Sequence, residues 1–181
     1  DNEETGSLTK QGADSTFLDE VLKRISLASG KDEEGHYRVV SSSFMVSADN
    51  AHAVHPNHPE KADPINRPMI NKGIVIKFNA AQHYTTDAVS CAVYRDLCES
   101  NDIPVQVFTN RSDTRGGSTL GNVSNAHVSL NTVDIGLAQL AMHSCYETVG
   151  ARDTKHLVDA MTIFYSKTFR VDAGGSFELL D

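Results

Sequence analysis

Several features that would define a function class at once are missing from this chain of 181 residues. No apolar run approaches the roughly 20 residues that a membrane-spanning helix needs, so we expect no membrane partner. Lys and Arg number 16 against 24 acidic residues, and with no basic cluster the net charge of −8 argues against nucleic acid as a partner. The sequence also has no Walker loop, no Gly-x-Gly-x-x-Gly, no Gly-x-Ser-x-Gly elbow and no internal repeat.

Cysteine is scarce, and its spacing indicates no disulfide framework. The three residues Cys91, Cys98 and Cys145 are odd in number and include no Cys-x-x-Cys pair. We expect reduced, buried thiols, which favours an intracellular, cytoplasmic location.

The length and composition are those of one globular domain with a core of its own. Hydrophobic residues make up 39% of the chain and charged residues 22%. The chain opens directly on the acidic run Asp1-Asn2-Glu3-Glu4, with no strand or helix before it. We therefore expect residues 1–181 to be the carboxy-terminal part of a longer protein.

Hydrophobic periodicity predicts strands that alternate with helices. We expect helices over residues 16–28, 86–100 and 154–167, strands over 37–46, 73–78, 104–108 and 133–137, and loops over 1–12, 31–35, 47–68 and 111–122. This alternation predicts an α/β fold, a three-layer sandwich with a mostly parallel central sheet. The sheet is expected to be incomplete, because the amino-terminal part is missing.

Metal-compatible side chains are concentrated in residues 47–61, just after the expected strand at 37–46. Asp49 follows the carboxyl end of that strand, where ligands bind in open α/β sheets. Together with His52 and His55 it offers ordinary zinc ligands. The alternative is that Asp49 caps a turn and the histidines lie on a surface loop, which is what we expect for His58.

Two further candidates lie far from this loop in the sequence. In the pair Glu3-Glu4, one carboxylate could coordinate a divalent metal while the other acts on a water, although most such pairs are solvated surface. His143 follows an apolar stretch, and a lone histidine there is more often a hydrogen-bonded core or surface residue. Its position past another strand would bring it to the same sheet edge as Asp49. Ser144 lacks the setting of a nucleophile.

Segments along nearly the whole chain resemble the aspartyl aminopeptidase family of dinuclear zinc exopeptidases. The matching segments are DNEETGS (1–7), SADNAHAVHPN (47–57), NKGIVIK (71–77), PVQV (104–107), GSTLG (117–121) and QLAMHS (139–144). The resemblance implies that Glu3 is the general base, that Glu4 and His143 bind one zinc, and that Asp49 binds the other. Manganese or cobalt would suit the same ligands. A bridging aspartate and a further histidine ligand of the family lie upstream of Glu3, outside this chain.

The resemblance also implies a substrate site and an activity. His52, Lys77 and Tyr84 match positions that contact substrate, and Lys77 would pair with an acidic side chain. The complete protein would be a homo-oligomer that removes an unblocked amino-terminal residue, Asp or Glu, from peptides. Arg115 departs from the family pattern and adds a positive charge near the cleft, which leaves the preferred side chain open.

Two other function classes remain open at this stage. The chain could be a non-catalytic binding module on the same scaffold, which would not need Glu3. It could also be a processed subunit that works beside another chain carrying the missing ligands. By itself, the chain is expected to bind zinc poorly and to be inactive.

Overall fold

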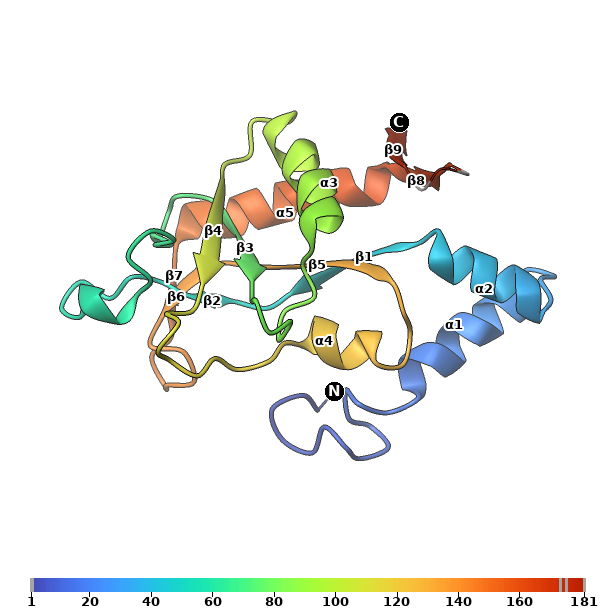
Figure 1. Ribbon diagram of the computed structural model, residues 1–181, viewed down its shortest axis with the longest axis horizontal. Coiled ribbons are helices and arrows are strands. Elements are labelled where there is room, and N and C mark those ends of the chain that lie inside the picture. Colours follow the sequence, from blue (N-terminus) through green and yellow to red (C-terminus); the bar gives the residue numbers. More distant parts are fainter. Residues whose placement is uncertain (1, 173, 175, 181) are drawn as a thin grey trace.

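Helices and strands alternate along most of the chain in the computed structural model, which describes residues 2–172, 174 and 176–180 (Figure 1). The helices are α1 (Phe17–Ala28), α2 (Glu33–Ser41), the 3-10 turn η1 (Pro59–Lys61), α3 (Ala88–Glu99), α4 (Leu120–Asn125) and α5 (Ala151–Ser166). The strands are β1 (Phe44–Ala48), β2 (Ala51–His52), β3 (Ile74–Phe78), β4 (Val105–Thr109), β5 (Asn131–Gly136), β6 (Ala138–Leu140), β7 (Thr148–Val149), β8 (Thr168–Val171) and β9 (Phe177–Leu180).

The central sheet has the strand order β1-β5-β3-β4. Strands β1 and β5 pair in parallel, as do β3 and β4, and the two pairs are joined antiparallel between β5 and β3. Helices α3 and α5 lie on one face and α4 on the other, which gives three layers (Figure 1). The predicted α/β sandwich with a mostly parallel sheet is therefore confirmed. Because β1 and β5 are parallel, their carboxyl ends meet at one edge.

Successive side chains of β3 point to opposite faces of the sheet, so they belong to two separate hydrophobic clusters. Ile74 and Ile76 face α3 and α5, where they pack with Tyr94 in the larger cluster and are fully buried. Val75 points to the other face and belongs to a smaller cluster with Tyr84, Phe108 and two alanines. Each fully buried isoleucine contributes roughly 1.5–3 kcal/mol to stability. The smaller cluster lies beneath the cavity described below.

The predicted strand at 37–46 was wrong over its first half, because residues up to Ser41 form α2. Asp32 caps this helix by accepting a hydrogen bond from the Gly35 amide at 2.8 Å, within what was expected to be a turn. The apolar residues of 37–46 belong partly to the end of α2 and partly to β1. Because β-branched residues favour strands, the pattern placed the start of the strand too far toward the amino terminus. Because β1 ends at Ala48, Asp49 still follows a strand.

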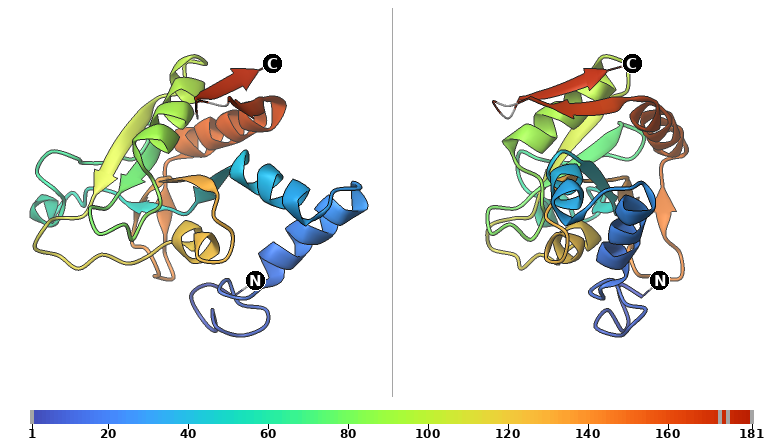
Figure 2. Two further views of the ribbon diagram at one scale, coloured as in Figure 1. Left: turned by 45° about the vertical axis from the view of Figure 1, so that its right-hand side comes forward. Right: turned by 90° about the vertical axis from the view of Figure 1, so that its right-hand side faces the viewer.

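Other short elements were not predicted. Helix α4 begins within the expected loop 111–122, and β2, β6 and β7 form a small second sheet. The β8–β9 hairpin lies on the side of the sheet that α3 and α5 cover, away from the amino-terminal loop (Figure 2). Phe169 of the hairpin stacks on Phe44 of β1, with ring centroids 4.9 Å apart. Aromatic packing therefore holds the hairpin against the core.

The thiols are free, as expected, but they are not all buried. Cys98 is buried, Cys91 is partly buried and Cys145 is exposed on the loop after β6. None of the described helices is long and apolar enough to cross a membrane.

Candidate functional site

Asp49 is held at the carboxyl edge of β1 by the chain that runs from β5 into β6. The Asp49 amide donates to the Ile135 carbonyl at 2.9 Å, and the Ala51 amide donates to the Leu137 carbonyl at the same distance. Between these bonds the loop passes so close to Gly136 that a Cβ there would overlap the Asp49 carbonyl oxygen. A side chain at Gly136 would therefore displace Asp49.

Lys77 supports the same turn from the neighbouring strand β3. Its Nζ donates to the Asp49 and Asn50 carbonyls at 2.9 and 3.3 Å, and to Asp49 Oδ2 at 3.3 Å. The Lys77 side chain is only 3% exposed. Its ammonium therefore pairs with the Asp49 carboxylate and holds the backbone carbonyls of Asp49 and Asn50. The prediction that Lys77 contacts substrate stays a prediction.

The amino-terminal loop brings Glu3 and Glu4 to this edge. Glu4 Oε1 lies 3.0 Å from His143 Nε2, although the two residues are 139 positions apart in the sequence. Both side chains are exposed. The loop is also tied to the segment after α4 by a hydrogen bond between His127 Nε2 and Asp14 Oδ1 at 2.6 Å. His143 itself has a left-handed backbone with φ of 67°, and its amide donates to Glu147 Oε1 at 2.6 Å. This conformation sets the direction of the imidazole.

Electrostatics link Glu3 to the other candidates. Burial raises the pKa of the Glu3 carboxyl, and the charges of Glu4 and Asp49 and a hydrogen bond with Glu4 raise it further, while His143 lowers it. The three predicted metal ligands, Glu4, Asp49 and His143, therefore all lie within electrostatic reach of Glu3. Asp1, the first residue of the acidic run, lies outside the described residues.

The chemistry of these donors suits a divalent cation, but the set is not complete. Carboxylate and imidazole are ordinary zinc ligands, and the Glu4–His143 contact places two of them side by side. Within the described part of the chain, however, no group of three His, Cys, Asp or Glu residues is arranged to hold a metal ion. Asp49 stands apart from the pair, with its carboxylate on Lys77. The described residues thus bring together two of the three predicted metal ligands, Glu4 and His143, a pair called the half-site below.

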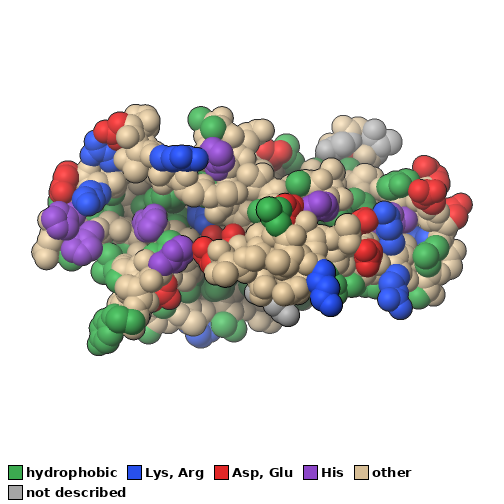
Figure 3. Space-filling view, turned by 90° about the horizontal axis from the view of Figure 1, so that it is seen from below, with side chains coloured by type: hydrophobic (Ala, Val, Ile, Leu, Met, Phe, Trp, Pro, Cys, Tyr) green, Lys and Arg blue, Asp and Glu red, His purple; other side chains and the backbone are tan. Residues whose placement is uncertain are grey.

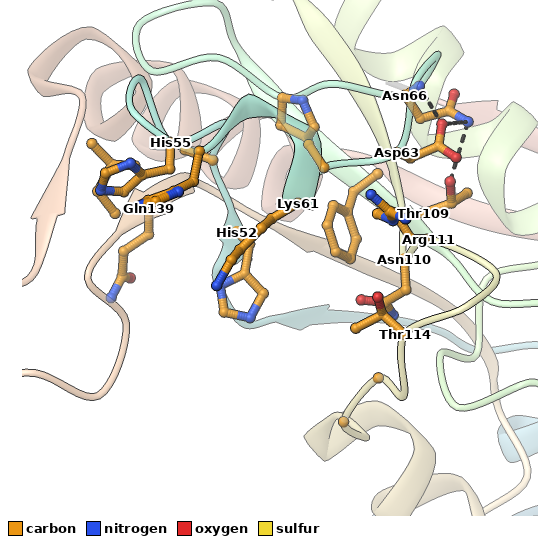
Figure 4. Close-up of a pocket in the computed structure, with 18 of the residues that line it drawn as sticks. His52, His55, Lys61, Asp63, Asn66, Thr109, Asn110, Arg111, Thr114 and Gln139 are labelled. Carbon is orange, nitrogen blue, oxygen red and sulfur yellow. Dashed lines mark hydrogen bonds between the residues drawn. The ribbon is translucent and has the colours of Figure 1, made fainter.

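A cavity of about 330 Å³ opens beside these residues. Its lining comes from β2, the ends of β4 and β6, the loop 53–68 and the loop 109–117. In Figure 4, His52 reaches into the open part of the cavity, between Gln139 on one side and Asn110 on the other. Histidine and basic side chains gather around a hollow at this end of the molecule (Figure 3). The cavity is therefore rich in hydrogen-bond donors.

Two of the predicted substrate contacts, His52 and Tyr84, line this cavity. Burial lowers the pKa of His52, and the charges of Lys77 and His143 lower it further against the opposing effect of Asp49. Burial also raises the pKa of Tyr84, whose hydroxyl accepts a hydrogen bond from Asn110 Nδ2 at 3.1 Å. The two side chains are thus held neutral, one as an imidazole and one as a phenol.

The remaining histidines of the loop lie farther out. His55 and His58 are exposed on the cavity rim with ring centroids 5.3 Å apart, and His58 Nδ1 lies 3.2 Å from Glu60 Oε1. The surface position expected for His58 is confirmed. Gly116 and Gly117 line the cavity. A Cβ at Gly116 would overlap the Asn110 side-chain amide, so the absence of a side chain lets the loop approach Asn110 closely.

Asp134, a residue that sequence reasoning missed, connects the walls of the cavity. It is fully buried on β5, and its Oδ2 accepts hydrogen bonds from the Thr85 amide at 2.6 Å, the Thr85 hydroxyl at 2.8 Å and the Thr119 hydroxyl at 2.9 Å. Thr85 follows Tyr84, and Thr119 lies between Gly117 and α4. A lone aspartate within an apolar strand was the available signal, because a buried charge needs partners.

Asn50, which also was not predicted, joins the turn before β2 to β6. Its Nδ2 donates to Gln139 Oε1, and its Oδ1 accepts from the Leu137 amide at 3.0 Å. These bonds fix the segment between Asp49 and His52.

Known proteins resemble this chain along most of its length. Residues 1–165 match the family model described as aminopeptidase I zinc metalloprotease, M18. A probable M18 family aminopeptidase 2 from Clostridium acetobutylicum is 54% identical over 166 residues, which is 92% of this chain and 38% of that protein. The chain thus spans well under half the length of the curated relatives it matches.

Solved structures resemble the fold over the same extent. Ape4, in its complex with Nbr1, is 40% identical with a TM-score of 0.84, covering 90% of this chain and 31% of that one. The S. cerevisiae mApe1 dodecamer is 34% identical with a TM-score of 0.80, covering 92% of this chain and 36% of that one. The chain therefore belongs to the M18 family, the aminopeptidase I zinc metalloproteases.

Proposed function

We propose that the complete protein is a metalloaminopeptidase that removes one unblocked amino-terminal residue, Asp or Glu, from peptides. Residues 1–181 would form the carboxy-terminal part of its catalytic domain. The observation that carries the proposal is the contact between Glu4 and His143 at 3.0 Å. The adjacent Glu3 lies within electrostatic reach of Asp49. Membership in a zinc metalloprotease family supports the reaction class.

In this proposal Glu4 and His143 bind one zinc and Asp49 binds the other, with the remaining ligands supplied by parts of the protein outside this chain. When bound, zinc polarises the substrate carbonyl and lowers the pKa of water. Manganese or cobalt would suit the same nitrogen and oxygen donors.

Glu3 would be the general base. Its carboxylate accepts a proton from the attacking water and later passes it to the leaving amine. Its partial burial beside two other carboxylates favours proton uptake, because each of these raises its pKa. Lys77 would keep Asp49 charged and oriented, since its Nζ contacts both the carboxylate and the backbone of that residue.

The cavity would hold the substrate's first side chain. His52 and Tyr84 present neutral hydrogen-bonding groups to it, and its basic lining includes Lys61, Arg111 and Arg115. A lining of this kind favours carboxylate over apolar side chains, which supports a preference for Asp and Glu.

We further propose a homo-oligomer in the cytoplasm, with peptides as partners and neither nucleic acid nor membrane. The resemblance to a dodecameric aminopeptidase supports the first point. The net charge of −8 supports the absence of nucleic acid.

The reaction itself is tested with the complete protein and paired substrates. We expect cleavage of Glu- and Asp-p-nitroanilide and no measurable cleavage of the same compounds after amino-terminal acetylation, because acetylation removes the positive charge that the acidic edge would hold. Release of p-nitroaniline is followed by absorbance. Equal rates on the free and acetylated compounds would rule out an aminopeptidase.

The half-site leads to a separate expectation for residues 1–181 alone. Isothermal titration with zinc should show weak binding, because the described residues bring only Glu4 and His143 together as ligands. Circular dichroism of the same sample would verify that the chain is folded. Tight uptake of two zinc ions would contradict this expectation.

A further inference from the structure

We propose that Arg115 selects substrates with an acidic first side chain by pairing with that side chain's carboxylate. This inference rests on the function proposed above and names a specificity residue for it. The cavity has an excess of positive charge. Its lining contains Lys61, Arg111 and Arg115, whereas Asp63 is its only acid among the described residues. Asp63 Oδ1 is engaged by the Ile65 and Asn66 amides at 2.9 and 2.7 Å.

The two arginines on the cavity loop differ in what they bind. Arg111 Nε and Nη2 pair with the two Asp113 carboxylate oxygens at 2.8 and 2.5 Å, and its Nη1 donates to the Glu60 carbonyl. Arg111 is thus neutralised and serves to fasten the loop to η1. In the part of the chain that the structure describes, no carboxylate forms an ion pair with Arg115. Its guanidinium keeps its donors for a ligand.

The other cations near the cavity are less suited to this role. A backbone hydrogen bond, His58 and Lys61 together lower the pKa of Glu60, so Lys61 has an acidic neighbour in Glu60. Lys77 has three oxygen acceptors on residues 49 and 50 and is not part of the cavity lining.

The backbone around Arg115 is anchored on both sides. Before it, the Thr114 amide donates to the Arg111 carbonyl at 3.0 Å, and Arg111 is itself fastened. After it, Gly116 packs against Asn110, and the Thr119 hydroxyl donates to Asp134. An exposed side chain on a fixed backbone matches a planar, bidentate carboxylate contact, which arginine makes better than lysine.

The test compares Arg115→Gln with the unaltered complete protein on Glu- and Leu-p-nitroanilide. We expect kcat/KM for the Glu substrate to fall about tenfold or more, the value of a charge-assisted hydrogen bond in a partly solvated site, with little change for Leu. Arg115→Lys should retain part of the preference. Arg95→Gln removes the same charge from the outer surface of α3, where Arg95 lies 3.6 Å from Glu99, and should leave the Glu-to-Leu ratio unchanged.

An equal fall on both substrates, or an unchanged ratio, would overturn the role of Arg115. A wild-type preference for Leu would overturn it as well. Failure of the proposed function would look different, because the unaltered protein would then cleave neither compound.

Discussion

Glu3→Gln in the complete protein is expected to lower kcat for peptide hydrolysis by about 10²–10⁴-fold, the usual contribution of a general base. Glutamine keeps the size and the hydrogen-bonding shape of glutamate but cannot accept the proton of an attacking water at neutral pH. Glu3 is adjacent to Glu4, which contacts His143. In the proposed mechanism Glu3 would therefore reach the water that a bound metal activates.

The zinc content of the Glu3→Gln variant shows whether Glu3 has a catalytic or a structural role. Metal content measured by atomic emission should match the wild type, because Glu3 is not a proposed ligand. Glu99→Gln is the matched control, since Glu99 lies at the exposed end of α3 and pairs only with Arg95 among the described residues. Retained peptidase activity in Glu3→Gln would refute the role of Glu3 and revive the non-catalytic binding module.

Asp134→Ala is expected to lower the free energy of unfolding of the complete protein by roughly 3–5 kcal/mol. The substitution removes the acceptor of three hydrogen bonds, leaving the Thr85 amide and two threonine hydroxyls unpaired in a buried site. It also removes the hydrogen bonds that hold two segments of the cavity lining in place. Thr85 adjoins Tyr84, and Thr119 follows Gly117 two positions later. We therefore expect KM to rise together with the loss of stability.

Urea unfolding and steady-state kinetics measure the two effects. Asp134→Asn should recover much of the stability, because one amide oxygen can still accept bonds from both threonines. Asp159→Ala is the matched control on α5, where an exposed pair with Lys155 at 2.6 Å is worth about 1 kcal/mol or less. A loss no larger than that of Asp159→Ala would show that Asp134 does not hold the cavity walls.

Local patterns in the sequence predicted the large elements well. Helices α1, α3 and α5 and strands β3, β4 and β5 lie close to where the spacing of apolar residues placed them. The pattern failed at 37–46, where one apolar run is shared by the end of α2 and the start of β1. It also failed for the two- and three-residue strands β2, β6 and β7, which are too short to show a period.

The four candidate side chains Glu3, Glu4, Asp49 and His143 could be identified from sequence alone, because they stand at positions that match a zinc aminopeptidase. The contacts that support them became visible only in the folded chain. Lys77 donates a hydrogen bond to Asp49, and Asn50 donates one to Gln139. Asp134 accepts hydrogen bonds from Thr85 and Thr119. These pairs are separated by 15 to 89 positions in the sequence. Buried polar groups need hydrogen-bond partners, and folding brings those partners from distant parts of the chain. The local spacing of residues therefore cannot predict these long-range hydrogen bonds.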